Sequence, residues 1–359
     1  MQAGPRRWHS WAMDVTDDFT APHQYLNTAS MGLPPRTTQQ ALRTSHQDWA
    51  HGDAQASDYD VAVARSRELY AELVHVDIRQ VTIGHQVAPV VGLLAAAVPD
   101  GATVLVSTDA FTSLTFPFAA HADRGVQVIE VPLDELAEHI DADTYLVAVE
   151  SVQSATGRLA DLDAIEAACT RHGAELIVDT TQSAGWLDLD ASRFAATVCG
   201  GYKWLLSPRG TAFLTLRPDL IDRLRPLAAN WFAGAQVWDS IYRMPLRLAT
   251  DARRFDVSPA WHSWVGTEAS LTYLAGLGVP AVHDHAVAVA RAFTDAADLP
   301  PGDSAIVSLR TDEQTGTIMA QHEVRAAERD GRLRLSFYLY NTSERAAELG
   351  AALAGHVRN

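Results

Sequence analysis

Between about residues 80 and 216, short runs rich in β-branched residues alternate with segments whose apolar positions recur at helical spacing. The short runs have the length and composition of strands. The candidate strands are 103–107, 126–131, 145–149, 175–179, 196–199 and 211–216. Strands that alternate with helices predict an α/β protein with a mainly parallel central sheet and helices on both of its faces.

The clearest single unit of this pattern lies between residues 145 and 179. Asp161 is a suitable amino-terminal cap, apolar residues follow it at helical spacing, and Gly173 suits the end of the helix. With a strand on each side, the segment predicts a βαβ unit. The apolar run 87–98 is too short to cross a bilayer, and we expect it to form a buried helix despite Pro89.

The pattern changes after residue 216. An irregular stretch rich in Trp and Arg covers residues 230–254, and a helix, a strand and a final helix follow it. This change predicts a second, smaller domain. The aromatic residues of the stretch suit either the lining of a substrate pocket or packing at a subunit boundary.

The composition narrows the class of protein. The chain has 359 residues, of which 47% are hydrophobic and 20% charged, as expected for a soluble globular enzyme. A net charge of −16 argues against nucleic acid or an anionic membrane as the partner, since both require a basic face. Small molecules are therefore the expected partners. Two cysteines cannot form a disulfide framework, so we expect a reducing, cytoplasmic location.

The basic residues are strongly imbalanced: the 28 basic residues are all arginine except Lys203. A guanidinium stays protonated in proteins, so only the lysine amine can form an imine with an aldehyde. Codon bias toward arginine would also leave a stray lysine. Lys203, however, lies in the segment Gly200–Trp204 directly after a predicted strand. This position favours a chemical role.

Other polar residues follow predicted strands, where α/β sheets bind ligands. Asp179 ends the apolar run 175–179, and its carboxylate could either cap a helix or hold a protonated pyridine nitrogen. Lys203 downstream favours the second interpretation. Phe111 could stack on a flat ring or pack in the core, and Gln153 could reach a phenolic oxygen or bond within its loop.

A possible phosphate site precedes the apolar helix. Gly84, His85 and Gln86 connect a short apolar run to the helix that begins near Val87. Backbone N–H groups at a helix amino terminus suit a phosphate, although an ordinary turn has the same sequence pattern. His85 fits either a ligand role or a surface turn.

With Phe111, Asp179, Gln182 and Lys203 in this order, the chain resembles the class V aminotransferase family of pyridoxal-phosphate enzymes, of fold type I. The similarity covers nearly the whole length. It rests on the segments 25–30, 179–182, 202–205, 208–210 and 334–342. The resemblance implies a large cofactor-binding domain over 36–245, and a smaller C-terminal α+β domain formed by 246–359 with the active-site segment 1–35.

The resemblance also implies roles for individual residues. Lys203 would form the imine with pyridoxal 5'-phosphate, Asp179 would pair with the pyridinium nitrogen, and Phe111 would stack on the ring. The phenolic oxygen would lie near Gln182 and Gln153. The residues at the phosphate would be Gly84, His85, Gln86 and Tyr202.

The substrate side and the assembly follow from the same resemblance. Arg334 matches the arginine that binds a substrate carboxylate, for which a guanidinium fork is well suited, although a surface salt bridge on a strand is the structural alternative. Ser30 belongs to the matching N-terminal active-site segment. The family also implies a homodimer with sites at its interface, in which Ser258 would approach the partner's phosphate.

The chain departs from the family pattern at several positions. Cysteine desulfurases carry a cysteine shortly before the matching arginine, and the segment 317–333 has none. We therefore expect that the protein is not a persulfide-type cysteine desulfurase, and that Cys199 is buried rather than reactive. In the family, a serine or threonine on the phosphate side is common three residues before the lysine, and Gly200 replaces it here. The spacing from Lys203 to Gly210 resembles the isopenicillin N epimerase-like branch.

The expected activity is that of an enzyme acting on an amino acid, with the freed Lys203 amine removing the Cα proton. The overall reaction would be transamination or β-elimination of the C–S lyase type. The alternatives are epimerisation of the isopenicillin N epimerase type and a non-catalytic pyridoxal-phosphate sensor. A sensor that regulates transcription needs a DNA-binding head, and the chain has no basic face for one.

Overall fold

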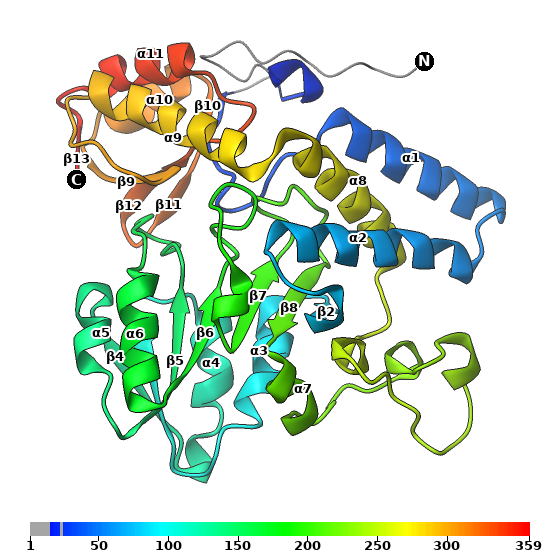
Figure 1. Cartoon of the computed structure of the whole chain (residues 1–359). Helices are drawn as coiled ribbons and strands as arrows, with labels where there is room; N and C mark the ends of the chain where they lie inside the picture. Colours follow the sequence, from blue (N-terminus) through cyan, green and yellow to red (C-terminus); the bar gives the residue numbers. More distant parts are fainter. Residues whose placement is uncertain (1–14, 22–23) are drawn as a thin grey trace.

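The computed structural model describes residues 15–21 and 24–359 (Figure 1). A seven-stranded sheet with the order β2-β8-β7-β6-β5-β3-β4 forms its larger part. The strands are β2 (Val81–Gly84), β3 (Thr103–Ser107), β4 (Gln127–Val131), β5 (Thr144–Glu150), β6 (Glu175–Asp179), β7 (Ala196–Gly200) and β8 (Ala212–Leu216). β4, β3, β5, β6 and β7 run parallel, and only β8 and β2 introduce antiparallel pairs. The predicted mainly parallel sheet is confirmed.

Helices cover both faces of this sheet, as predicted (Figure 1). They are α3 (Val87–Ala95), α4 (Thr112–Ala119), α5 (Leu136–His139), α6 (Leu162–His172) and α7 (Pro218–Arg223). Alternate residues of β3 point to opposite faces: Val104 and Val106 join the core under α3 and α4, whereas Leu105 joins the core under α5 and α6. Two apolar layers therefore hold the sheet between them.

The predicted βαβ unit is present in detail. The Asp161 carboxylate accepts a hydrogen bond from the backbone N–H of Ala164 at 3.0 Å, and Gly173 ends α6 with φ +77°. The expected buried helix is α3. Pro89 lies in its first turn, where no intrahelical N–H donor is needed, so the helix forms despite the proline.

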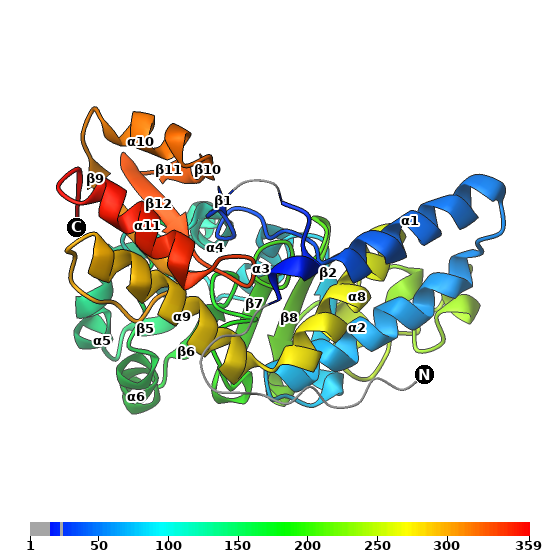
Figure 2. The ribbon, with the colours of Figure 1, turned by 90° about the horizontal axis from the view of Figure 1, so that it is seen from above.

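Three helices form a separate layer beside β2. They are α1 (Arg36–His51), α2 (Tyr59–Leu73) and α8 (Trp261–Leu277), and the two figures show them side by side (Figures 1 and 2). The irregular stretch that precedes α8 contains short 3-10 turns at Trp231–Ala233, Trp238–Ser240 and Ala252–Phe255. This stretch carries exposed apolar side chains, among them Tyr242 and Met244.

The smaller part has its own sheet, with the order β11-β12-β9-β13 and antiparallel pairing (Figure 2). Its elements are α9 (Val279–Ala296), β9 (Ile306–Thr311), α10 (Thr315–Gln321), β10 (Val324–Arg325), β11 (Ala327–Arg329), β12 (Arg332–Ser336), α11 (Ser343–Leu353) and β13 (Val357–Arg358). The N-terminal strand β1 (Gln24–Tyr25) pairs in parallel with β10. The domain boundaries at 36 and 246 stay predictions, and residues 1–14 and 22–23 of the predicted small domain lie outside the described residues.

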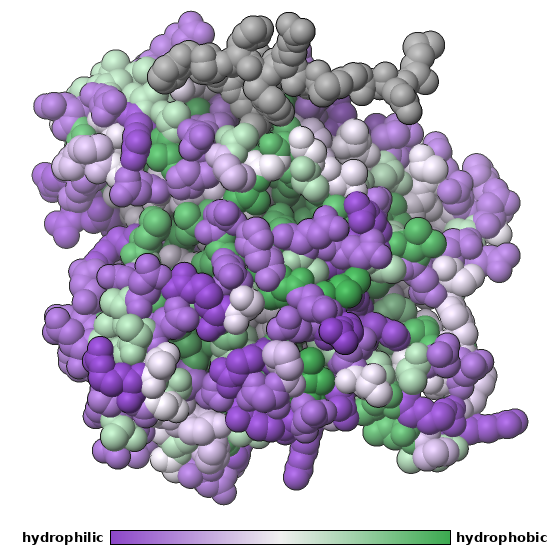
Figure 3. All heavy atoms as spheres, viewed as in Figure 1, coloured by the Kyte–Doolittle hydropathy of each residue, from purple (hydrophilic) through white to green (hydrophobic). Residues whose placement is uncertain are grey.

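The surface is mixed in character. Figure 3 shows apolar residues in an interrupted band across the middle of one face, between largely hydrophilic regions. Within the part of the chain that the structure describes, no helix is long and apolar enough to cross a membrane.

Candidate active site

A cavity of about 370 Å³ lies where the parallel strands β5, β6 and β7 end. Open α/β sheets bind ligands at this edge. The wall is formed by Gln86, Val87, Phe111, Thr112, Ser113, Glu150, Val152, Ser154, Asp179, Thr181, Gln182, Tyr202, Lys203 and Arg209. Six of the predicted site residues are among them: Gln86, Phe111, Asp179, Gln182, Tyr202 and Lys203.

Lys203 is buried in this wall, with 6% of its surface exposed. Its Nζ lies 5.3 Å from the centroid of the Phe111 ring and 5.8 Å from that of Tyr202. Burial lowers the pKa of the amine to about 8, although the Asp179 carboxyl opposes this change. At neutral pH the amine is therefore much closer to its nucleophilic, neutral form than an exposed lysine would be.

Two carboxyls face this amine from neighbouring strands. Asp179 ends β6 and Glu150 ends β5, and the two residues are direct register partners. Burial raises the pKa of both groups, that of Glu150 to about 8, while Lys203 acts in the opposite direction. Asp179 accepts a hydrogen bond from the Thr181 N–H at 2.8 Å, and Glu150 accepts one from the Phe111 N–H at 2.8 Å.

Glu150 thereby fixes the start of the loop that carries the Phe111 ring. Phe111 is 44% exposed, so it is part of the cavity wall and not of the core. The sequence left both possibilities open, and the structure places the ring toward the cavity, on the side of Lys203.

The loop that presents Lys203 is held from behind by the N-terminal segment. The N–H of Gly32 donates to the Tyr202 carbonyl at 2.9 Å. A Cβ at residue 32 would lie 2.0 Å from the Lys203 carbonyl oxygen, so any side chain there would displace the lysine loop. Glycine at this position is required by close backbone approach rather than by its φ angle.

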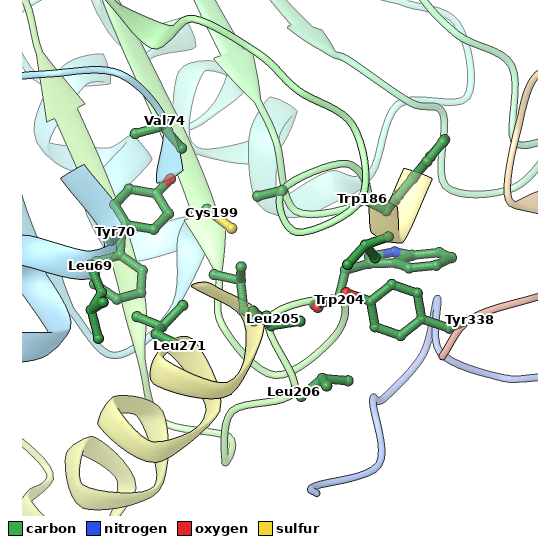
Figure 4. Close-up of a cluster of buried hydrophobic side chains, with 14 of the residues drawn as sticks. Leu69, Tyr70, Val74, Trp186, Cys199, Trp204, Leu205, Leu206, Leu271 and Tyr338 are labelled. Atoms are coloured by element: carbon green, nitrogen blue, oxygen red, sulfur yellow. Dashed lines mark hydrogen bonds between the residues drawn. The ribbon is translucent and has the colours of Figure 1, made fainter. Parts of the chain in front are cut away.

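Gln182 is locked in one orientation by buried neighbours. Its Oε1 accepts a hydrogen bond from the indole N–H of Trp204 at 2.8 Å, and its Nε2 donates to Ser154 Oγ at 2.9 Å and to the Ala29 carbonyl at 3.0 Å. Trp204 itself is fully buried against Trp186 and Tyr338 in the cluster shown in Figure 4. The residue after the lysine therefore orients a second residue of the wall.

The structure does not place Gln153 in the cavity wall. Its Nε2 donates to the Thr108 carbonyl at 2.8 Å, and its Oε1 accepts from the Thr156 hydroxyl at 2.6 Å. The loop after β5 turns the next residue, Ser154, into the wall instead. Loop hydrogen bonding, the alternative interpretation of Gln153, is what the contacts show.

The predicted phosphate residues are separated by the structure. Gln86 caps α3 and borders the cavity together with Val87. Gly84 is the last residue of β2 rather than part of a turn, and a Cβ there would lie 2.8 Å from Val90. His85 is exposed outside the wall. The helix amino terminus and Gln86 are thus the members of this loop that face the cavity.

Arg334 lies behind Ser154, with 1% of its surface exposed. Its Nη1 donates to the Ser154 carbonyl at 2.6 Å and its Nη2 to Ser30 Oγ at 2.7 Å, while its Nε has no hydrogen-bond partner. Burial and the nearby Arg329 lower the pKa of Arg334 to about 10. Among the described residues no carboxylate contacts this guanidinium, so the salt-bridge alternative is wrong.

Ser258 lies in the segment between the last 3-10 turn and α8, outside the cavity wall. Its predicted role concerns the phosphate of a partner subunit. It stays a prediction.

Eight residues of the wall were not among the predicted site residues: Val87, Thr112, Ser113, Glu150, Val152, Ser154, Thr181 and Arg209. The position of Glu150 at the end of a predicted strand is the same signal that identified Asp179. Ser154 and Thr181 each lie one or two residues from a predicted site residue. Arg209 is exposed, and its guanidinium carbon lies 5.1 Å from the Tyr202 ring centroid. It adds a positive charge to the cavity wall.

The fold and the wall define an α/β protein with one reactive amine beside a buried acid. A family model described as aminotransferase class-V matches residues 51–322, and the chain belongs to this family. A curated relative, the uncharacterised aminotransferase YcbU of Bacillus subtilis, is 31% identical over 301 residues, which are 78% of this chain and 80% of the relative. The isopenicillin N epimerase of Streptomyces clavuligerus is 27% identical over 57% of this chain and 56% of the length of the epimerase.

Solved structures share the fold. A C-DES variant with glycine covalently linked to its PLP cofactor matches with a TM-score of 0.84 and 20% identity, over 96% of this chain and 100% of C-DES. The cysteine desulfurase of Thermococcus onnurineus NA1 matches with a TM-score of 0.81 and 17% identity, over 95% and 97% of the two chains. Fold type I is therefore confirmed, and with the family so is pyridoxal phosphate as the predicted cofactor. Because these neighbours include a desulfurase, the comparisons do not support excluding that reaction.

Proposed function

We propose that this chain is a pyridoxal-phosphate enzyme that acts on an amino acid by transamination or by β-elimination at a C–S bond. One observation carries the proposal. Lys203, the single lysine of the chain, is buried in a cavity wall that also holds the carboxyls of Asp179 and Glu150, and the Arg334 guanidinium lies behind the wall residue Ser154. A lysine that served only solubility would be exposed.

The wall fits the cofactor chemically. When bound, pyridoxal phosphate supplies an aldehyde for an imine with a lysine amine and a ring that withdraws electrons from the substrate's Cα. Asp179 would be the acid for the ring nitrogen, and Phe111 offers an aromatic face. Ser154 offers its hydroxyl for the phenolic oxygen, and Gln182 lies beside it and orients that hydroxyl. The amino terminus of α3 and Arg209 offer N–H groups and charge for the phosphate.

The chain's own residues account for the proton chemistry. The Lys203 amine would be the base that takes the Cα proton of a bound amino acid. Burial keeps the pKa of this amine near 8, which lets it both accept and return a proton near neutral pH. Asp179, buried and hydrogen-bonded by Thr181, fixes where a positive charge is stabilised in the cavity.

Arg334 orients the substrate through its carboxylate. A guanidinium binds a carboxylate in a planar, bidentate manner, and the Nε of Arg334 is left without a partner. The hydrogen bonds to Ser154 and Ser30 hold the guanidinium in one plane. A substrate held in this way presents its Cα toward the Lys203 side of the cavity.

We also propose that the protein is not a persulfide-type cysteine desulfurase. That reaction needs a reactive thiol, and both cysteines of the chain are buried. Burial raises the pKa of Cys169 and of Cys199 to about 12, so neither is a thiolate near neutral pH. Two free thiols also suit the proposed cytoplasmic location.

The proposed assembly is a homodimer in which Ser258 approaches the partner's phosphate.

Epimerisation is the second candidate, because an isopenicillin N epimerase is among the curated relatives. The reactions are separated by mixing the purified protein with a panel of amino acids and S-substituted cysteines. Pyruvate with a released thiol identifies β-elimination, pyridoxamine phosphate identifies transamination, and formation of the amino acid inverted at Cα identifies epimerisation. Amino acids that bind without turnover would indicate a sensor. Protein that takes up no pyridoxal phosphate would contradict the proposal.

A further inference from the structure

A second arginine converges on the proposed substrate site. Arg329, at the end of β11, donates from its Nη2 to Ser30 Oγ at 3.1 Å. Arg334 donates from its own Nη2 to the same oxygen at 2.7 Å. One hydroxyl therefore accepts from two guanidiniums, and the two Nη2 atoms are at most about 6 Å apart.

Neither of the two cations has an acidic partner within residues 15–21 and 24–359. The other hydrogen bonds of Arg334 go to Ser154, and that of Arg329 goes to the backbone carbonyl of Glu328. Among the described residues, the other buried arginine is Arg67, and it contacts the Asp256 carboxylate. A buried guanidinium without a carboxylate, as at Arg334, is thus unusual for this molecule.

The pair is electrostatically unfavourable as it stands. Arg329 is one of the causes that lower the pKa of Arg334, which means that the two positive charges repel each other. A neutral serine hydroxyl accepts from both donors but cannot compensate either charge. A ligand with two negative groups would compensate both at once.

We propose that the substrate is an amino acid whose side chain carries a second anionic group, a carboxylate or sulfonate, and that Arg329 binds that group. This inference rests on the proposed function, in which Arg334 takes the α-carboxylate. Arg334 is buried and Arg329 is exposed, so the α-carboxylate enters the wall and the second group stays at the mouth of the site. Ser30 keeps the two forks at a spacing that a short aliphatic chain between two acids can match.

The test uses ligand pairs that differ only in one terminal group. Glutamate is compared with glutamine, and aspartate with asparagine, through the change in the cofactor's absorption spectrum on binding. Glutarate and its monoamide lack the amine, and calorimetry measures their affinity without any cofactor chemistry. We expect the diacid of each pair to bind about tenfold more tightly, the lower end for a charge-assisted hydrogen bond at an exposed site.

Two variants assign the preference to a residue. Arg329→Ala should reduce the ratio within each pair to near one. Arg325→Ala is the matched control, because it removes an exposed arginine from the same part of the molecule without touching Ser30, and it should keep the ratio. An Arg329→Ala protein that keeps the preference, or a wild-type protein that does not prefer the diacids, would overturn the inference.

The failure of this inference is distinguishable from that of the proposed function. Turnover of amino acids with no preference for diacids would leave the proposed function in place and remove the role of Arg329. Tight, Arg329-dependent binding of glutarate by a protein that turns over no amino acid would keep the role of Arg329 and contradict the proposed function. Weak binding of every diacid would contradict the paired-anion site itself.

Discussion

The two sides of the cavity differ in how their charges are balanced. On the sheet side, Lys203, Asp179 and Glu150 are buried together; the two carboxyls oppose the lowering of the Lys203 pKa, and Lys203 opposes the raising of the pKa of each carboxyl. On the side of the small C-terminal part, Arg334 and Arg329 share a serine and have no acidic partner among the described residues. The sheet side is complete in itself and suits a resident cofactor. In our proposal, an anionic substrate completes the other side by pairing with the two guanidiniums.

The strongest test of the sheet side is Lys203→Ala. We expect complete loss of covalent cofactor attachment, because no other lysine exists in the chain. Borohydride reduction followed by mass spectrometry measures the attachment. Lys203→Arg is the control that keeps the charge without the reactive amine, and it should also show no covalent cofactor attachment. A borohydride-stable adduct in the alanine variant would contradict the assignment.

The other side is tested by Arg334→Ala. Carboxylate substrates should bind about a hundredfold more weakly, because the variant removes a charge-assisted, bidentate interaction. The cofactor's colour should remain, since Arg334 lies behind the wall and not in it. Kinetics and absorption spectra of the same preparation separate the two effects. Loss of colour would mean that the two sides are not independent.

Glu150→Gln sharpens the comparison through pH. Burial raises the pKa of Glu150 to about 8 from a usual 4.5, so the cofactor-free folded protein keeps a proton that the unfolded chain releases between these values. The wild-type protein therefore loses stability as pH rises through this window. Glutamine has no proton to lose and still offers an oxygen to the Phe111 N–H.

The free energy of unfolding of Glu150→Gln relative to wild type should thus increase by about 4 kcal/mol between pH 5 and pH 8.5. Urea denaturation of the cofactor-free proteins at the two pH values measures this. If the difference in the free energy of unfolding between the variant and wild type is the same at both pH values, Glu150 is already ionised in the folded state.

The smallest expected effect comes from Trp204→Phe. Phenylalanine keeps a six-membered ring but is smaller than the indole, so a small cavity forms and the hydrogen bond to Gln182 Oε1 is lost, which should cost about 2 kcal/mol of stability. Cofactor affinity should fall severalfold because the Gln182 amide is no longer fixed. Thermal unfolding and cofactor titration measure the two effects. Trp49→Phe, at an exposed position, is the matched control and should change neither.

The sequence predicted what depends on local pattern. The strand ends at Asp179 and near Lys203 were predicted because apolar runs stop there, and parallel strands bring such ends to one edge. Gln153 was placed one residue from the wall residue Ser154, because the loop after β5 has no periodicity that fixes which side chain points inward. Arg329 was missed since its contact with Ser30 joins residues 299 positions apart.

The stretch from Asn27 to Gly32 contacts residues on both sides of the cavity from behind its wall. Ser30 meets the two guanidiniums, Ala29 receives the Gln182 amide, and Gly32 lies against the backbone of the lysine loop. One short segment of six residues thus supports both the lysine loop and the two arginines. A truncation or fusion near this stretch would therefore disturb the proposed cofactor residues and the proposed substrate residues together.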